Sequence, residues 1–144
     1  MKRCWFAFFL AWAIPAIGVA QTTVAPVEVP TARIRAYFTP GHLVETAIAE
    51  EITNAKSEIR VQAYSFTNPL IVQALIGAQQ RGVDVVLVLD KSNRTQKYSA
   101  ADYASHAGIP TLIDDRHAIA HNKIMIIDGK VVITGSYNFT RAAE

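Results

Sequence analysis

The sequence has little cysteine, little tryptophan and almost no excess of charge. Its single cysteine, Cys4, and its two tryptophans, Trp5 and Trp12, lie within the first twenty of 144 residues. The remainder of the chain therefore has no thiol that could form a disulfide or act as a nucleophile. Lys2 and Arg3 are two of the 14 basic residues, which leaves 12 basic against 12 acidic side chains after residue 20. The overall charge therefore indicates neither a nucleic-acid nor a membrane partner.

The first twenty residues have the pattern of a secretory signal peptide. A basic pair is followed by an apolar run over Cys4–Val19, and the run ends in small residues. This run is shorter than the roughly 20 residues that cross a bilayer. We therefore expect residues 1–20 to be removed during export to the periplasm or the medium, rather than kept as an anchor. Residues 21–31 mix small, polar and proline residues and are predicted to form an extended leader.

Residues 32–144 are predicted to form one domain in which strands and helices alternate. Apolar periodicity and turn residues place the elements, with Asn68 and Pro69 typical of a helix start. The expected elements are strand 34–38, helix 42–56, strand 58–66, helix 68–81, strand 83–89, helix 96–106, strand 111–113 and hairpin strands 123–127 and 130–134. This order predicts an α/β fold with a mixed β-sheet flanked by helices on both faces.

The predicted hairpin holds the most informative group of polar residues. His121 and Lys123 are two apart and should project from the same side of a strand. The antiparallel return then brings Ser136 and Asn138 back to the start of the first strand. An imidazole, an ammonium, a hydroxyl and a carboxamide at one end of a sheet suit a phosphodiester. In such a site Lys123 would contact the non-bridging oxygens, and His121 would act as nucleophile or general base.

Asp128 lies at the other end of this hairpin. Together with Gly129 it forms a dipeptide that strongly favours a two-residue hairpin turn. At about 3.3 Å per residue it is roughly 15 Å from His121. We therefore predict a structural role for Asp128, either in the turn itself or in holding the hairpin against a neighbouring segment.

The spacing of these residues resembles the signature of the phospholipase D superfamily. The sequence reads H-x-K-x4-D-x6-G-S-x-N, from His121 through Lys123, Asp128 and Ser136 to Asn138. The surrounding segments Gln62-Ala63-Tyr64-Ser65-Phe66-Thr67 and Leu87-Val88-Leu89-Asp90 are also similar to the small secreted bacterial endonucleases of that superfamily. The resemblance spans about residues 32–144.

The resemblance implies a mechanism and an assembly. His121 would attack phosphorus to form a covalent phosphohistidine, while a second histidine protonates the leaving oxygen and then activates water. Lys123, Ser136 and Asn138 would hold phosphate oxygens, and no metal ion or other cofactor would be needed. The chain contains the H-x-K motif once, whereas larger members contain it twice. The resemblance implies that, as in other members with a single motif, two chains form a homodimer in which two copies of His121 share one active site.

Several alternatives remain open from the residues. His117 and His121 could be metal ligands, although the segment does not have the pattern of a helix. Lys91, Arg94 and Lys97 could line a solvated loop or a track for a polyanion. The leading function is a non-specific endonuclease acting on DNA and possibly RNA. The alternatives are a phospholipase D acting on lipid headgroups and a truncated, inactive nucleic-acid-binding domain.

The resemblance also predicts that the sequence is incomplete. In members of the superfamily, the segment after the signature continues into a further strand and a terminal helix. That strand carries a glutamate that orients the catalytic imidazole. Glu144 comes too early in the chain to be that residue. We therefore expect this chain to be a fragment of a longer protein.

Overall fold

The computed structural model describes residues 32–95 and 100–144. The expected signal peptide and leader, and Lys97, lie outside this part of the chain. Residues 35–144 form one compact unit. Its elements in chain order are α1 (Leu43–Asn54), β1 (Glu58–Ala63), α2 (Pro69–Gln80), β2 (Asp84–Asp90), α3 (Ala101–His106), β3 (Thr111–Asp114), β4 (Lys123–Ile127) and β5 (Val131–Thr134), with short 3₁₀ helices at Lys91–Arg94 and Arg141–Ala143.

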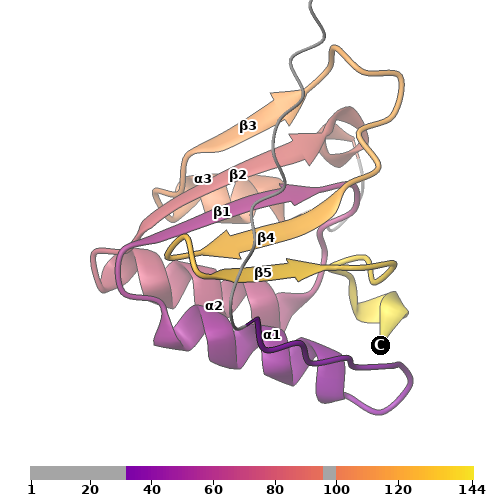
Figure 1. Ribbon diagram of the computed structural model, residues 1–144. Helices are drawn as coiled ribbons and strands as arrows, with labels where there is room; N and C mark the ends of the chain where they lie inside the picture. The colour runs from indigo at the N-terminus through magenta and orange to yellow at the C-terminus, as the bar shows by residue number, and fades with distance from the viewer. Residues whose placement is uncertain (1–31, 96–99) are drawn as a thin grey trace, which may run out of the picture. The chain divides into compact units, whose positions relative to one another are not determined.

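The five strands form one mixed sheet in the order β3-β2-β1-β4-β5 (Figure 1). Strands β1, β2 and β3 are parallel, whereas β4 runs antiparallel to both β1 and β5. The predicted α/β class and mixed sheet are therefore confirmed. The hairpin turn lies where it was predicted, since Asp128 and Gly129 both have positive φ, 54° and 62°, as a primed turn requires. The strands pair through Ile127 and Val131, however, so three residues separate them rather than the predicted two.

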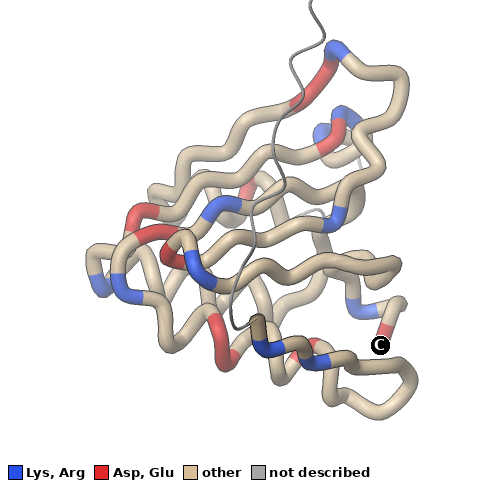
Figure 2. Tube along the Cα trace, in the orientation of Figure 1, with Lys and Arg blue, Asp and Glu red and all other residues tan. Residues whose placement is uncertain are grey.

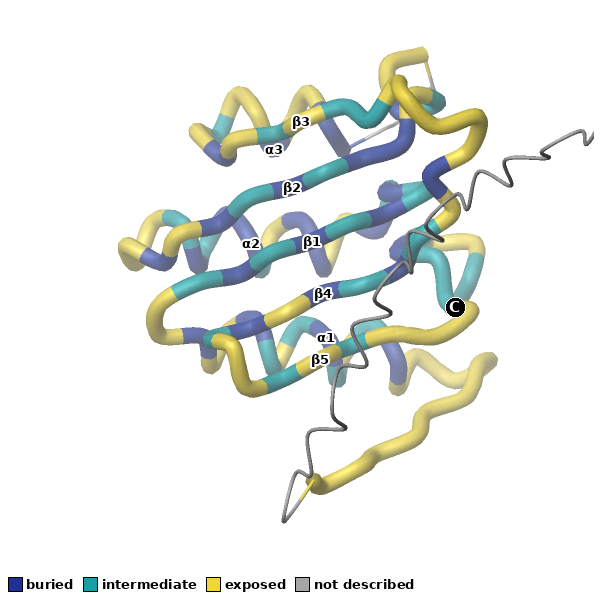
Figure 3. The backbone as a smooth tube through the Cα atoms, turned by 45° about the horizontal axis from the view of Figure 1, so that its top comes forward, coloured by how far each residue is buried: buried dark blue, intermediate teal, exposed yellow. Residues whose placement is uncertain are grey.

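The three described helices lie against the same face of the sheet (Figures 1 and 3). Parallel strands are joined by right-handed crossovers. The chain moves outward from β1 to β2 to β3 in one direction, so both crossover helices, α2 and α3, fall on one side. The expectation of helices on both faces is thus not met within the described residues.

The hydrophobic core lies between this helical layer and the sheet. Burial alternates along β1, where Ile59, Val61 and Ala63 are buried and the residues between them are partly exposed. The opposite face of the sheet is mixed: it carries the ion pair of Arg60 with Asp84 as well as exposed apolar residues such as Ile126 and Val132. Burial therefore follows the side on which the helices pack (Figure 3).

Local signals explain where the elements begin and end. Asn68 caps α2 as predicted, because its Oδ1 accepts hydrogen bonds from the backbone N–H groups of Leu70 and Ile71.

The predicted strand over 34–38 is wrong: these residues are exposed and have no regular secondary structure. Apolar alternation over so few residues does not form a strand without a neighbouring strand to pair with. No helix in the described part of the chain is long and apolar enough to cross a bilayer.

Candidate active site

The candidate site lies along the edge of the sheet that is formed by strand ends, where three strands end and another begins. The parallel strands β1, β2 and β3 end here, and the pairing of Ala63 with Lys123 places the start of β4 at the same edge. The pairing of Ile124 with Thr134 brings the end of β5 there as well. Segments distant in sequence are therefore gathered at one place, as is usual for sites in α/β proteins.

Lys123 is a buried cation at this edge. Its residue is 7% exposed, and burial lowers the pKa of its ammonium group below the ordinary lysine value. Its Nζ donates a hydrogen bond to the carbonyl oxygen of His121 at 3.2 Å. Within the described residues, no carboxylate lies at ion-pair distance from it. A buried charge without a counter-charge is costly, and an anionic ligand would supply that counter-charge.

His121 lies two residues before the start of β4 and is exposed. Its ring packs edge-on against Tyr64, with 4.6 Å between the ring centroids. The Nζ of Lys123 lies 5.4 Å from the centroid of the same tyrosine ring. The structure therefore brings His121 and Lys123 together around Tyr64. The predicted pairing of the two side chains at one end of the sheet agrees with this arrangement.

Ser136 and Asn138 follow β5 on the segment that returns to this edge. Ser136 is exposed, whereas Asn138 is partly buried. The Asn138 Oδ1 atom is buried and has no hydrogen-bond partner in the described part of the chain. Buried polar atoms are nearly always paired, so a donor from a water molecule or another bound group would satisfy this oxygen.

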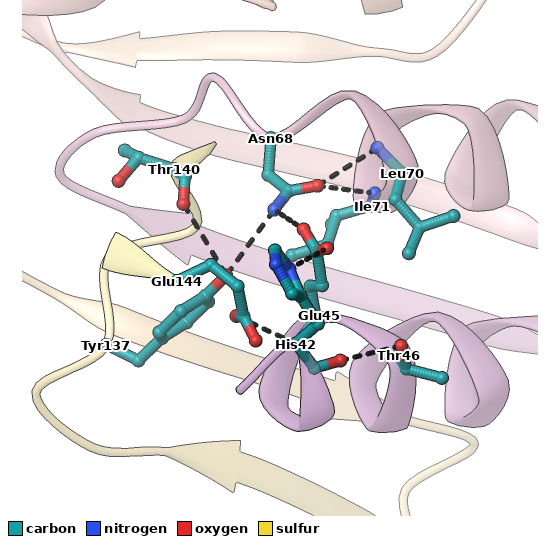
Figure 4. A network of polar contacts seen from close by, with 9 residues as sticks. All are labelled: His42, Glu45, Thr46, Asn68, Leu70, Ile71, Tyr137, Thr140 and Glu144. Carbon is teal, nitrogen blue, oxygen red and sulfur yellow. Dashed lines mark hydrogen bonds and ion pairs between the residues drawn. The ribbon is translucent and has the colours of Figure 1, made fainter. Parts of the chain in front are cut away.

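A polar network fixes the segment that carries Asn138 (Figure 4). The Asn68 side chain is fully buried and donates hydrogen bonds to Glu45 Oε2 at 2.6 Å and to the Tyr137 hydroxyl at 3.4 Å. The hydrogen bond from Asn68 is the main reason that the pKa of Glu45 is lowered. Burial, followed by the nearby Glu144, raises the pKa of Tyr137. Sequence reasoning identified Asn68 as a helix cap but gave no signal of this second role.

Asp90 holds the backbone next to His121, and Asn93 holds the backbone of Tyr64, whose ring contacts His121. Asp90 Oδ2 accepts a hydrogen bond from the backbone N–H of Ala120 at 2.8 Å, and Asn93 Nδ2 donates to the carbonyl oxygen of Tyr64 at 2.6 Å. Burial alone would raise the pKa of Asp90, but hydrogen bonds from Ser92 and Ala120 outweigh it and lower the pKa. In the sequence Asp90 directly follows the predicted strand 83–89. Its contact with Ala120 depends on tertiary structure and could not be predicted.

Asp128 lies at the opposite end of the hairpin, as predicted. Its carboxylate accepts hydrogen bonds from the backbone N–H groups of Lys56, Ser57 and Glu58 and from the Ser57 hydroxyl, at 2.7 to 3.2 Å. These hydrogen bonds lower the pKa of Asp128 strongly. The carboxylate thus ties the hairpin turn to the start of β1. This geometry supports the structural role.

The loops beside the site carry further charged residues. Lys91 Nζ donates to the carbonyl oxygen of His117 at 3.2 Å, and Arg94 forms an ion pair with Asp115 at 3.3 Å. His117 Nδ1 contacts Asp114 Oδ2 at 2.7 Å. Figure 2 shows Lys and Arg positions interspersed with Asp at this edge. Across residues 32–95 and 100–144, no three His, Cys, Asp or Glu side chains are grouped as a metal site.

Known proteins with similar sequences carry the same domain. Residues 48–144 match the family model described as "Cardiolipin synthase, PLD-like domain". The chain is 45% identical over 117 residues to a protein named phospholipase D from Rickettsia conorii, which covers 81% of this chain and 58% of the relative. It is 33% identical over 89 residues to a mouse mitochondrial cardiolipin hydrolase, covering 62% of this chain and 40% of the relative. The chain thus spans somewhat more than half the length of the rickettsial relative.

Solved structures show the same fold. The phospholipase D family member Nuc from Salmonella typhimurium superposes with a TM-score of 0.65 at 44% identity, covering 69% of this chain and 66% of Nuc. NucT from Helicobacter pylori superposes with a TM-score of 0.59 at 26% identity, covering 68% of each chain. The family match covers most of the chain and contains every residue of the H-x-K signature. The chain therefore belongs to the phospholipase D-like family.

Proposed function

We propose that this chain carries the active site of a metal-independent phosphodiesterase that cleaves nucleic acid through a phosphohistidine on His121. The observation that supports this most strongly is Lys123, a buried cation beside the exposed His121 with no carboxylate partner in the described chain. A phosphodiester is an anion that would neutralise this charge while presenting phosphorus to the imidazole.

The chemistry proceeds in two displacements. An imidazole nitrogen of His121 attacks phosphorus, the new N–P bond forms, and the bond to the leaving oxygen breaks. A second histidine donates a proton to that oxygen. That second histidine then takes a proton from water, the water oxygen attacks phosphorus, the N–P bond breaks and His121 is regenerated. Lys123 and the Asn138 carboxamide would stabilise the charge on the non-bridging oxygens during both steps.

Nucleic acid is the favoured substrate class because of the side chains around the site. Cations lie on the loops after β2 and β3, at Lys91, Arg94 and Arg116. Arg94 is paired with Asp115, whereas Lys91 and Arg116 form no ion pair within the described residues and are available to a polyanion backbone. The chain after residue 20 has no tryptophan, a residue enriched where proteins contact the membrane interface.

Phospholipid hydrolysis is the second candidate, on two observations. The Rickettsia conorii relative bears the name phospholipase D. In addition, Ile119 is 63% exposed two residues before His121, and an exposed apolar side chain of this kind could contact acyl chains. The reaction at phosphorus would be the same in both cases.

Supercoiled plasmid and phosphatidylcholine vesicles distinguish the candidates. In excess EDTA we expect the full chain to relax and fragment the plasmid, because Lys123 replaces a metal ion in neutralising the phosphate. We expect it to release no choline from the vesicles. Plasmid cleavage is followed on agarose gels and choline by an enzymatic assay, with His121→Asn as the inactive control. Intact plasmid with released choline would support the phospholipase, and intact versions of both would support a binding domain.

We further propose that activity requires a homodimer. In-line displacement needs the nucleophile and the acid on opposite sides of phosphorus. A two-fold axis through the site would place His121 of one copy opposite that of the other. Because the chain contains one H-x-K motif, the partner copy would provide the second histidine.

Mixing wild-type chain with His121→Asn chain tests this assembly. After co-refolding at equal concentrations, a shared site predicts about one quarter of the wild-type activity, because only dimers of two wild-type chains are complete. Independent sites predict about one half. His106→Asn, which changes an exposed histidine at the end of α3, is the mixing control. A wild-type chain that sediments as a fully active monomer would contradict the proposal.

A further inference from the structure

We propose that Tyr64 is a positioning residue for the reaction at His121, acting through its ring rather than its hydroxyl. The expected effect on the reaction rate rests on the proposed function. The contacts of the Tyr64 ring do not depend on the substrate. Tyr64 follows β1 by one residue and is partly exposed. It is not one of the residues of the H-x-K signature.

The Tyr64 ring contacts both members of the motif. The His121 ring packs against it at an interplanar angle of 61°, with 4.6 Å between centroids. The Lys123 ammonium lies over the same ring, 5.4 Å from its centroid. An edge-on aromatic pair and a cation over a π face are both attractive arrangements. One ring therefore restricts the imidazole and partly covers the ammonium.

The Tyr64 backbone is itself fixed from two sides. Its N–H donates to the carbonyl oxygen of Asn122 at 2.8 Å, and its carbonyl oxygen accepts from Asn93 Nδ2 at 2.6 Å. Asn93 is 3% exposed and lies in the 3₁₀ helix after β2. The first contact ties Tyr64 to the residue between His121 and Lys123. The ring thus belongs to a rigid frame, as a positioning residue requires.

Within the described residues, the Tyr64 ring is what limits rotation of the exposed His121 side chain, whose ring nitrogens make no hydrogen bond in this part of the chain. A nucleophile that samples several rotamers is seldom aligned with phosphorus, and misplacement by about 1 Å can reduce the rate roughly 100-fold. The Tyr64 ring limits that freedom while leaving both imidazole nitrogens available for chemistry.

Two substitutions separate the ring from the hydroxyl. Tyr64→Phe keeps the ring, and we expect kcat within about threefold of wild type. Tyr64→Leu removes the ring, and we expect kcat to fall about 10- to 100-fold with little change in KM, because alignment matters most in the transition state. The assay uses bis(p-nitrophenyl) phosphate, a small phosphodiester, so that the result does not depend on the class of the natural substrate. Equal losses in both variants, or no loss in Tyr64→Leu, would overturn the proposal.

NMR of the full chain tests the geometry without any activity. We expect nuclear Overhauser contacts between the Tyr64 and His121 ring protons in wild type, and a ring-current shift of the His121 signals. Tyr64→Phe should keep this shift and Tyr64→Leu should abolish it, with His121→Asn used to assign the signals. Absence of the contacts in wild type would refute the positioning role even if Tyr64→Leu fails to fold. A wild-type chain with the contacts but no hydrolysis would instead count against the proposed function alone.

Discussion

Replacing His121 with asparagine should reduce phosphodiester hydrolysis by about 10⁴-fold or more, because removal of a nucleophile eliminates the covalent pathway. His121 is exposed at the sheet edge and its side chain contacts Tyr64, so the fold should tolerate the change. The loss should appear in kcat, measured on bis(p-nitrophenyl) phosphate and on plasmid. Rapid quenching of the wild-type reaction, followed by mass spectrometry, should detect a His121 peptide that carries the retained half of the phosphodiester, a p-nitrophenyl phosphoryl group when the small substrate is used.

His106→Asn provides the matched control for this result. His106 is also exposed, and its Nδ1 contacts the carbonyl oxygen of Asp102 within α3. The same change of side chain there should leave the rate within about threefold, as for surface substitutions away from a site. If His121→Asn kept more than about one hundredth of the wild-type kcat, a nucleophilic role for His121 would be untenable.

Replacing Asp128 with alanine should lower the melting temperature by roughly 5–10 °C. The substitution leaves the backbone N–H groups of Lys56, Ser57 and Glu58 without the carboxylate that accepts their hydrogen bonds. Thermal unfolding followed by circular dichroism measures the change. Asp128→Asn keeps one acceptor oxygen and should lie between wild type and alanine. Asp102→Asn, on the exposed face of α3, should change the melting temperature very little.

The contribution of Asp128 should also depend on pH in a defined direction. Its pKa is lower in the folded chain than in the unfolded chain. The carboxylate therefore stabilises the fold fully above its ordinary pKa of about 4, and this contribution is lost as pH falls below that value. The difference in melting temperature between wild type and Asp128→Ala should thus be largest near neutral pH and shrink on acidification. A difference that grew on acidification would contradict this assignment.

Much of the fold follows from local sequence signals. Asn68 followed by Pro69 marks the start of α2, and the Asp128-Gly129 dipeptide marks the hairpin turn. Strand order is not a local property, and the placement of α2 and α3 on one face follows from it. Residues 34–38 show where local signals fail. Apolar alternation predicts a strand only where another strand is available to pair with it.

The site was predictable to the extent that spacing determines position. His121 and Lys123 are two apart on one segment, so their proximity follows from strand geometry. Tyr64, Asp90 and Asn93 come from the ends of other strands, and their contacts depend on the pairing of β1 with both β2 and β4. Such contacts leave no pattern in a single sequence, because each residue alone is an ordinary strand or turn residue.

At Lys123, the stability of the core and the proposed binding of phosphate make conflicting demands. Its side chain belongs to the same buried row of β4 as Met125 and Ile127, where an apolar residue would pack without the cost of desolvating a charge. A chain selected for thermal stability alone should therefore lose this lysine early. On the proposed function, Lys123 is a position at which core stability is given up for phosphate binding.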